Sequence, residues 1–212
     1  MKLNPSRFFS GKYLELAKAI SSEDLVKIRK LAKEVPLDFI AEENMTLLFW
    51  TIVEKSPKAL NALLIAGADP NLYVDKQGSA VNFTCALEDT NYIKLLLTYG
   101  GNPNAMMTNG QPLTIFAALH SKWQNVNILL EHGADINAKD SNGNTVAMLY
   151  ASLNDFKEVY SLIKLGAEIT VQNENKVSLL NRITRASPIK ETDSYKWLQK
   201  VKQLLQTMGY NT

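Results

Sequence analysis

The chain has 212 residues, of which 46% are apolar and 21% are charged, a composition typical of a globular protein with a sizeable core. Its 23 basic and 21 acidic residues leave a formal net charge of +2, which gives no electrostatic reason to expect nucleic acid or an anionic membrane surface as a partner. The single cysteine, Cys85, excludes an intramolecular disulfide.

The first seven residues contain no apolar segment of the kind found in an intact signal peptide. The longest apolar stretches are also too short to span a bilayer, so we expect no membrane span. Two locations fit these observations. They are the cytoplasm and, for a chain from which a signal or lipoprotein segment has been removed, the periplasm.

A nine-residue pattern recurs along the chain. A pair of aliphatic residues is followed by two variable residues, a glycine, a small residue, an Asp, Asn or Glu, one more variable residue, and an Asn or Thr at the end. The copies lie at 63–71, 96–104, 129–137 and 162–170, and their glycines are 33 residues apart each time. A step kept three times predicts a stack of similar structural repeats.

Within each repeat the residue types predict two helices and a turn. Asn142-Gly143 is a turn signal, because Asn and Gly tolerate a positive φ. Thr46 and Thr145 can cap a first helix through their hydroxyl groups. Leu129-Leu130 belongs to the apolar stripe of a second helix, which we expect Gly133 to end.

These residues resemble the ankyrin repeat family, whose pattern is roughly D-x-x-G-x-T-P-L-H-x-A-A followed by L-L-x-x-G-A-D-x-N. The resemblance covers nearly the whole chain. It implies an all-α fold, an ankyrin-repeat solenoid of about six helix-turn-helix units with short hairpin fingers and a core that runs through the stack. This register is expected to bury Leu96, Ala118, Leu130 and Ala151.

We expect one domain over 1–212, and its irregular repeats can be named in chain order. The first has Glu34 in place of the glycine, although Gly11 and the helical run 13–19 keep the register. In the third, Gly78 lies one place late, which predicts a distorted hairpin. The last has extra residues at 185–195 before its second helix resumes. The first and last act as caps, and the six repeats are 8–40, 41–73, 74–106, 107–139, 140–172 and 173–212.

The remaining large or charged side chains are expected to have structural roles. Trp50, Phe83 and Phe116 recur at the 33-residue step on the first helices, which favours a place in the core between repeats. The lysines near the end of the chain are interpreted as a solvated face of the last helix, namely Lys190, Lys196, Lys200 and Lys202.

No set of residues suited to catalysis is found. The sequence has no nucleophile elbow, no His and Cys spacing for zinc, no Walker loop and no G-x-G-x-x-G. His120 and His132 are interpreted as ordinary surface or helix-end residues, and Cys85 as a buried, unreactive thiol. We therefore predict that the protein is not an enzyme and holds no cofactor and no metal.

In the ankyrin family, the hairpin tips and the exposed side of the first helices line a concave face that binds proteins. Tyr73, Met106 and Met107 would place large apolar groups at hairpin tips, where solvent alone favours polar residues. Acidic residues also crowd the early repeats; a merely solvated polar face is the alternative. The expected partner-binding residues are Glu42, Glu43, Met45, Glu54, Tyr73, Asp75, Lys76, Leu87, Glu88, Met106, Met107, Thr108, Asn109, His120, Lys139, Ser141 and Asn142, with Val53, Leu119 and Leu153 on the same face.

The opening segment 8–20 and the style of 67–71 look like a group of short bacterial ankyrin proteins. Several members of that group are immunity proteins that neutralise secreted antibacterial toxins, including phospholipases of type VI secretion systems. This weaker resemblance implies a protein that is a monomer when free and inhibits a cognate toxin by binding it. The alternatives are a secreted or regulatory ankyrin adaptor and a non-catalytic subunit of an enzyme complex. A purely structural spacer would not need apolar hairpin tips.

Overall fold

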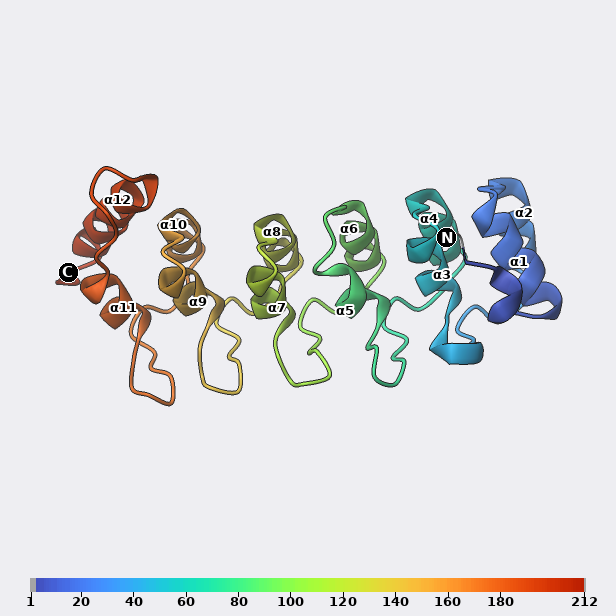
Figure 1. The fold of residues 1–212 in the computed structure, drawn as a ribbon, viewed down its shortest axis with the longest axis horizontal. Helices are drawn as coiled ribbons and strands as arrows, with labels where there is room; N and C mark the ends of the chain where they lie inside the picture. Colours follow the sequence, from blue (N-terminus) through green and yellow to red (C-terminus); the bar gives the residue numbers. More distant parts are fainter. Residues whose placement is uncertain (1–2, 212) are drawn as a thin grey trace. The chain divides into compact units, whose positions relative to one another are not determined.

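The computed structural model describes residues 3–211, which fall into two compact parts, an N-terminal unit (1–108) and a C-terminal unit (109–212). Each unit consists of helix pairs joined by finger-like loops (Figure 1). The N-terminal unit contains η1 (Pro5–Arg7), α1 (Gly11–Ser21), α2 (Leu25–Leu31), η2 (Glu42–Asn44), α3 (Leu47–Val53), α4 (Pro57–Ile65), α5 (Ala80–Thr84) and α6 (Asn91–Thr98). The C-terminal unit contains α7 (Leu113–Leu119), α8 (Trp123–Glu131), α9 (Val146–Ser152), α10 (Phe156–Lys164), α11 (Leu179–Arg185) and α12 (Asp193–Thr207).

The all-α fold of helix-turn-helix repeats is confirmed. Each predicted repeat contributes one helix pair, and residues 3–211 form isolated β-bridges at the fingers but no strand. In the N-terminal unit, α1, α3 and α5 are the first helices of their pairs, and α2, α4 and α6 are the second. In the C-terminal unit, α9 packs on both α7 and α11, while α10 packs on α9 and α12.

Threonine hydroxyls cap the first helices α3 and α9, as the sequence predicts. Thr46 Oγ1 accepts a hydrogen bond from the backbone N–H of Phe49 at 3.1 Å, and Thr145 Oγ1 accepts one from Met148 at 3.4 Å. Both threonines are buried, so water cannot replace these bonds. The hydroxyls therefore satisfy backbone donors that the helix itself leaves unpaired.

Glycines end the second helices, again as predicted. After α8, the N–H of Gly133 donates to the carbonyl oxygen of Leu130 at 3.0 Å, and the N–H of Ala134 donates to that of Leu129 at 2.9 Å. This pair of bonds is the Schellman motif, and it needs a residue with a positive φ, here +89° at Gly133. The same pair of bonds follows α10 at Gly166.

The core of each unit lies between its helix pairs. Leu63 and Leu96 in the N-terminal unit, and Leu129 and Leu162 in the C-terminal unit, are fully buried. They stand at the same place in successive repeats, so one apolar row per unit follows the 33-residue step. The predicted burial of Leu96, Ala118 and Ala151 is confirmed.

The predicted burial of Leu130 is wrong, because this side chain is only half-buried. The equivalent residue of the next repeat, Ile163, is buried on α10, which packs against α9 on one side and α12 on the other. Within the C-terminal unit α8 packs chiefly on α7. Leu129 faces that contact and is fully buried, whereas the adjacent Leu130 points to a different side of the helix.

The core assignment of the aromatic row is correct for Trp50 only. Trp50 is fully buried, because Phe8 and Phe9 lie over its ring with centroids 5.8 and 5.9 Å away and its indole N–H donates to the carbonyl oxygen of Ala17 at 3.0 Å. Phe83 has no such cover and is 47% exposed. Phe116, in the C-terminal unit, is half-buried.

The irregular repeats differ from their neighbours in ways the sequence partly predicts. Gly11 keeps the register but begins α1 instead of turning a finger. The finger at 74–78 is distorted, as expected, with positive φ at Lys76 and Gly78, whereas the finger at 140–144 has it at Gly143. Only part of the extra stretch 185–195 is a loop, since α12 already begins at Asp193.

Candidate partner-binding surface

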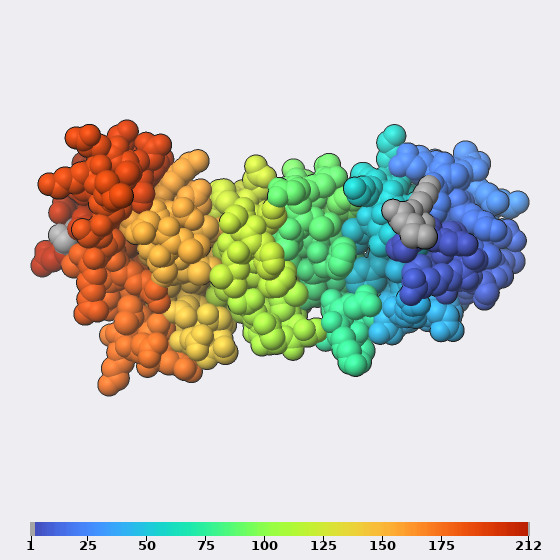
Figure 2. All heavy atoms as spheres, in the orientation of Figure 1, coloured from blue at the N-terminus to red at the C-terminus, as the bar shows by residue number. Residues whose placement is uncertain are grey.

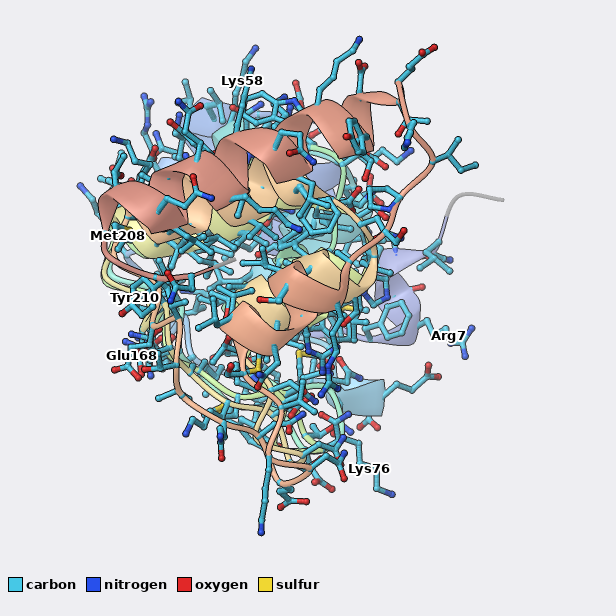
Figure 3. The ribbon with its side chains drawn as sticks, turned by 90° about the vertical axis from the view of Figure 1, so that its left-hand side faces the viewer. Arg7, Lys58, Lys76, Glu168, Met208 and Tyr210 are labelled. Atoms are coloured by element: carbon cyan, nitrogen blue, oxygen red, sulfur yellow. The ribbon has the colours of Figure 1, made fainter. Side chains whose placement is uncertain are left out.

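In the N-terminal unit, the predicted binding residues lie on η2, at the ends of α3 and α5, and on two fingers. Tyr73 is 55% exposed and Met106 is 48% exposed, but both lie at the base of a finger and not at its tip, where the sequence placed them, because the turns are formed by the residues that follow. The finger at 74–78 projects from the surface (Figure 2), with Lys76 at its outer end (Figure 3). Two large apolar side chains thus keep about half of their surface in solvent. The other exposed predicted residues of this unit are Glu42, Glu43, Asp75, Glu88 and Thr108, while Met45, Glu54, Leu87 and Met107 are half-buried.

The methionines at the base of the finger after α6 are held against α5. Asn82 Nδ2 donates to the carbonyl oxygen of Met106 at 2.8 Å and lies 3.7 Å from the sulfur of Met107. Asn82 is itself buried and completes the capping box of α5 with Ser79. The backbone that carries Met106 is therefore fixed, while its side chain stays exposed. A pre-positioned apolar group of this kind loses little entropy when a partner covers it.

The predicted acidic surface is less uniform than the sequence suggests. Glu43 Oε1 accepts a hydrogen bond from Nε of Arg7 at 2.8 Å, so its charge is paired with a cation from η1. Figure 3 shows Arg7 extending outward from the helices. Both side chains are more than half exposed, and such surface pairs contribute little to stability. Glu42, on the same turn, makes no ion pair within residues 3–211.

A groove that the sequence did not indicate lies between η1 and η2. It has a volume of about 440 Å³ and is lined by residues 6–10 and 39–44. Its edge carries two exposed apolar side chains, Phe39 and Ile40, and Phe39 stacks on Tyr13 with centroids 4.3 Å apart. The lining of the groove therefore places exposed apolar side chains next to the carboxylates of Glu42 and Glu43. The only feature of the nearby sequence that could have indicated this groove is the aromatic pair Phe8-Phe9.

In the C-terminal unit, the predicted residues lie at the end of α7 and on the fingers. His120 is exposed at the C-cap of α7, with Nδ1 2.8 Å from the carbonyl oxygen of Phe116. Leu119 and Leu153 are 52% and 51% exposed at the ends of α7 and α9. Leu153 lies one place later in its repeat than Leu119, so each of these two first helices ends with an exposed apolar group, although not at the same position. Asn109, Lys139, Ser141 and Asn142 are exposed as well.

Neighbouring fingers of this unit are hydrogen-bonded to each other. The carbonyl oxygen of Asn142 accepts from the N–H of Glu174 at 3.0 Å, and Asn173 Nδ2 donates to Asn144 Oδ1 at 2.8 Å. Gly143 lies so close to Asn173 that an added Cβ would come within 3.1 Å of its Cα. These contacts fix the spacing of the two fingers, so the surface between them is pre-formed.

A small cleft opens between these fingers and the first helices of the C-terminal unit. Its volume is about 180 Å³, and it is lined by Gln111, Ile115, Leu119, Asp140, Asn144, Leu149, Ser152 and Arg182. Sequence reasoning included Leu119 but missed Arg182. The 33-residue step could have identified Arg182 as a residue of this surface. Positions 50, 83, 116, 149 and 182 form one row on the first helices.

The other titratable groups do not form a reactive site. Burial raises the pKa of the Cys85 thiol to about 12, and Cys85 is fully buried beside the carbonyl oxygen of Asn82 at 3.0 Å. The thiol therefore stays protonated at neutral pH. Among residues 3–211, no cluster of three or more His, Cys, Asp or Glu side chains could hold a metal ion. No helix in that range is long and apolar enough to cross a bilayer.

Two solved structures with the same architecture are ankyrin proteins. The chain superposes on EF0377, described as an ankyrin repeat protein, with a TM-score of 0.70 and 21% identity, covering 92% of this chain and 97% of that one. It superposes on an ankyrin repeat domain from Acinetobacter baumannii AYE with a TM-score of 0.72 and 21% identity, covering 91% and 97%. At this identity the likeness establishes the fold alone.

Sequence comparisons lead to the same family. A stretch of 91 residues is 32% identical to Protein PhlB of Serratia liquefaciens, and it spans 43% of this chain and 40% of PhlB. The family model for ankyrin repeats in three copies matches residues 48–140 and 80–173, more than half of the chain. The protein therefore belongs to the ankyrin repeat family, and its repeats form a protein–protein interaction module.

Proposed function

We propose that this protein is a non-catalytic immunity protein, which binds a secreted antibacterial toxin such as a phospholipase and inhibits it by occupying its surface. The observation that carries the binding role is the exposed apolar surface on the fingers and first helices. In the N-terminal unit this surface includes Tyr73, Phe83 and Met106, and in the C-terminal unit Leu119 and Leu153. Exposed apolar groups on a pre-formed scaffold are typical of binding surfaces.

The choice of a toxin as partner rests on resemblance. The opening segment 8–20 and the repeat style at 67–71 look like short bacterial ankyrin immunity proteins, and one relative, PhlB, comes from a bacterium. A stoichiometric inhibitor needs only a rigid complementary surface. The fingers of this chain provide one through backbone and asparagine hydrogen bonds. The free protein is proposed to be a monomer.

The proposal includes the absence of catalysis. A hydrolase would need a nucleophile, a base and an oxyanion site that converge. The candidate groups in this chain are separated, since the Cys85 thiol is buried and the imidazoles of His120 and His132 contact carbonyl oxygens of their own helices at 2.8 Å. The purified chain should neither turn over phospholipid or peptide substrates nor retain a stoichiometric metal in elemental analysis.

The test is binding kinetics with the partner that co-purifies from the native strain. Tyr73→Ala should raise the dissociation rate and cost roughly 1–4 kcal/mol, as truncation of a buried hot spot does. Charge reversal at Glu42 and Glu43 should mainly slow association, and the loss should shrink at high salt because ions screen the attraction. Glu42→Lys alone should give the cleaner result, since Glu43 is already paired with Arg7.

Matched controls separate binding from folding. Tyr99→Ala removes a tyrosine at the end of α6, and Glu168→Lys reverses a carboxylate in the loop after α10; neither residue lies on a finger tip or a first helix. Both controls should bind with unchanged rates, and all variants should keep the wild-type thermal melt. Full affinity and full toxin protection in a triple variant with Tyr73→Ala, Glu42→Lys and Glu43→Lys would mean that the partner uses another surface.

A further inference from the structure

The cleft of the C-terminal unit contains a guanidinium group without a charged partner. Arg182, on α11, donates from one terminal nitrogen to Asn144 Oδ1 at 2.9 Å and from the other to Ser152 Oγ. Both acceptors are neutral. Its Nε atom is buried and has no hydrogen-bond partner within residues 3–211, and no carboxylate there forms an ion pair with it. A buried donor without a hydrogen-bond partner is energetically costly.

The walls of the cleft around this cation are apolar. Ile115 and Leu119 come from α7, and Leu149 comes from α9. Leu119 is more than half exposed at the mouth. A volume of about 180 Å³ is enough for one side chain and not for a large cofactor. The occupant must therefore be a small group with an aliphatic part and a part that accepts hydrogen bonds.

One acidic residue also lines the cleft, but its carboxylate is used by its own finger. Asp140 Oδ1 accepts from the N–H groups of Asn142 at 2.9 Å and Asn144 at 2.8 Å, and Asn144 Nδ2 lies within 3.4 Å of both carboxylate oxygens. Asp140 holds the turn of the finger and makes no ion pair with Arg182. The unused donors of Arg182 thus remain the strongest recognition element of the cleft.

We propose that this cleft binds an acidic side chain of the protein partner, with the carboxylate on Arg182 and the methylene groups of the same side chain against Ile115, Leu119 and Leu149. A carboxylate matches a guanidinium in charge and geometry, and such charge-assisted bonds are about twice as strong as neutral ones. This inference rests on the proposed binding function and deepens it. The N-terminal unit offers carboxylates to a basic region of the partner, and the C-terminal unit offers a cation to an acidic one.

The direct test uses two small probes that differ in one group, N-acetyl-glutamate amide and N-acetyl-glutamine amide. NMR titration follows the Nε–H signal of Arg182 in the full chain, assigned by its loss in Arg182→Gln. The glutamate probe should shift that signal at millimolar concentration and bind about tenfold more tightly than the glutamine probe, because only a carboxylate adds a charge to the bond. Equal binding of the two probes, or no shift with either, would overturn the proposal.

The matched variants are Arg182→Gln and Arg185→Gln, which remove guanidinium groups one helical turn apart on α11. Arg185 is exposed and lies outside the cleft. Arg182→Gln should weaken the glutamate probe about tenfold, Arg182→Lys should restore part of the loss, and Arg185→Gln should change nothing. Equal losses at both positions would mean that the probe responds to general positive charge, which contradicts a built site.

Binding measurements with the co-purified partner can test this inference separately from the proposed function. If Tyr73→Ala weakens binding of the co-purified protein while Arg182→Gln leaves it unchanged, the binding function stands and the role of the cleft is refuted. If Arg182→Gln also weakens binding about tenfold while its thermal melt is unchanged, both are supported. If no protein partner is found but the glutamate probe binds at Arg182, the cleft is a carboxylate site and the proposed function fails.

Discussion

At the scale of single residues, adjacent leucines of one apolar pair have different surroundings. Leu129 is fully buried, whereas Leu130 keeps part of its surface in water. Successive side chains of a helix point about 100° apart, so only one of the two can face the first helix of the repeat. The free energy of burying an apolar side chain scales with the area removed from water. The relative cost of truncating the two leucines therefore tests which side of α8 faces the core.

We predict that Leu129→Ala destabilises the protein by about 2–5 kcal/mol, the range for emptying a core position. Leu130→Ala should cost about half as much, because less of that side chain leaves water on folding. Urea unfolding followed by circular dichroism measures both changes in the free energy of unfolding. A larger cost at Leu130 than at Leu129 would contradict the register described for α8.

At the scale of helices, most repeats satisfy their unpaired backbone groups with the same two devices. The first helices α3, α5, α9 and α11 begin with a hydroxyl cap, at Thr46, Ser79, Thr145 and Ser178. The second helices α4, α6, α8 and α10 end with the two backbone bonds at a glycine. Both devices act within a few residues of sequence. That is why short helices, only 7 residues in α3 and in α9, can have defined ends.

We predict that Thr145→Ala lowers the free energy of unfolding by about 1 kcal/mol, the usual cost of losing an N-cap. Thr145→Ser should restore most of this loss, since it keeps the hydroxyl that accepts from Met148. Thr98→Ala serves as the control, because that exposed hydroxyl bonds to a carbonyl oxygen of its own helix, that of Lys94 at 2.7 Å, and caps no N-terminus. Chemical denaturation of the three variants gives the comparison, and an equal loss for Thr98→Ala would speak against capping as the cause.

At the scale of the whole molecule, stability is expected to be local. Each of the two compact units contains three helix pairs, and within a unit a pair contacts its neighbours in sequence. In such arrays the free energy of folding is close to a sum of repeat and nearest-neighbour contributions. Whether residues 1–212 unfold as one domain is therefore a matter of how strongly neighbouring repeats are coupled, and the single domain stays a prediction.

We predict that Ile183→Ala, which empties a fully buried position on α11, accelerates amide hydrogen exchange most in α11 and α12. A smaller effect is expected in α9 and α10, and none in α1 to α4, because the lost contacts belong to the last repeat. Thr184→Ala, at the adjacent exposed position, should leave exchange unchanged throughout. Equal acceleration in every helix would show instead that the chain opens as one cooperative domain.

The sequence by itself determined the repeat architecture of this protein. The 33-residue step, the caps at Thr46 and Thr145 and the helix-ending Gly133 and Gly166 depend on residues close together in the chain, so local physical rules predict them. The fold class and the burial of Leu96, Ala118 and Ala151 followed from the same register. Most of the predicted surface residues are indeed exposed, because the finger positions repeat with that step.

Only the tertiary structure decided which side chains contact a given position of the repeat. Trp50, Phe83 and Arg182 share one place in the repeat, yet Trp50 is buried under Phe8 and Phe9, while Phe83 is open to solvent. Arg182 lies in a cleft whose other groups, such as Asn144 and Ser152, are 38 and 30 residues away in sequence. A periodic pattern gives the direction of a side chain, but its neighbours come from other helices and fingers. The groove beside η2 and the Arg182 cleft therefore emerged only when those segments were packed together.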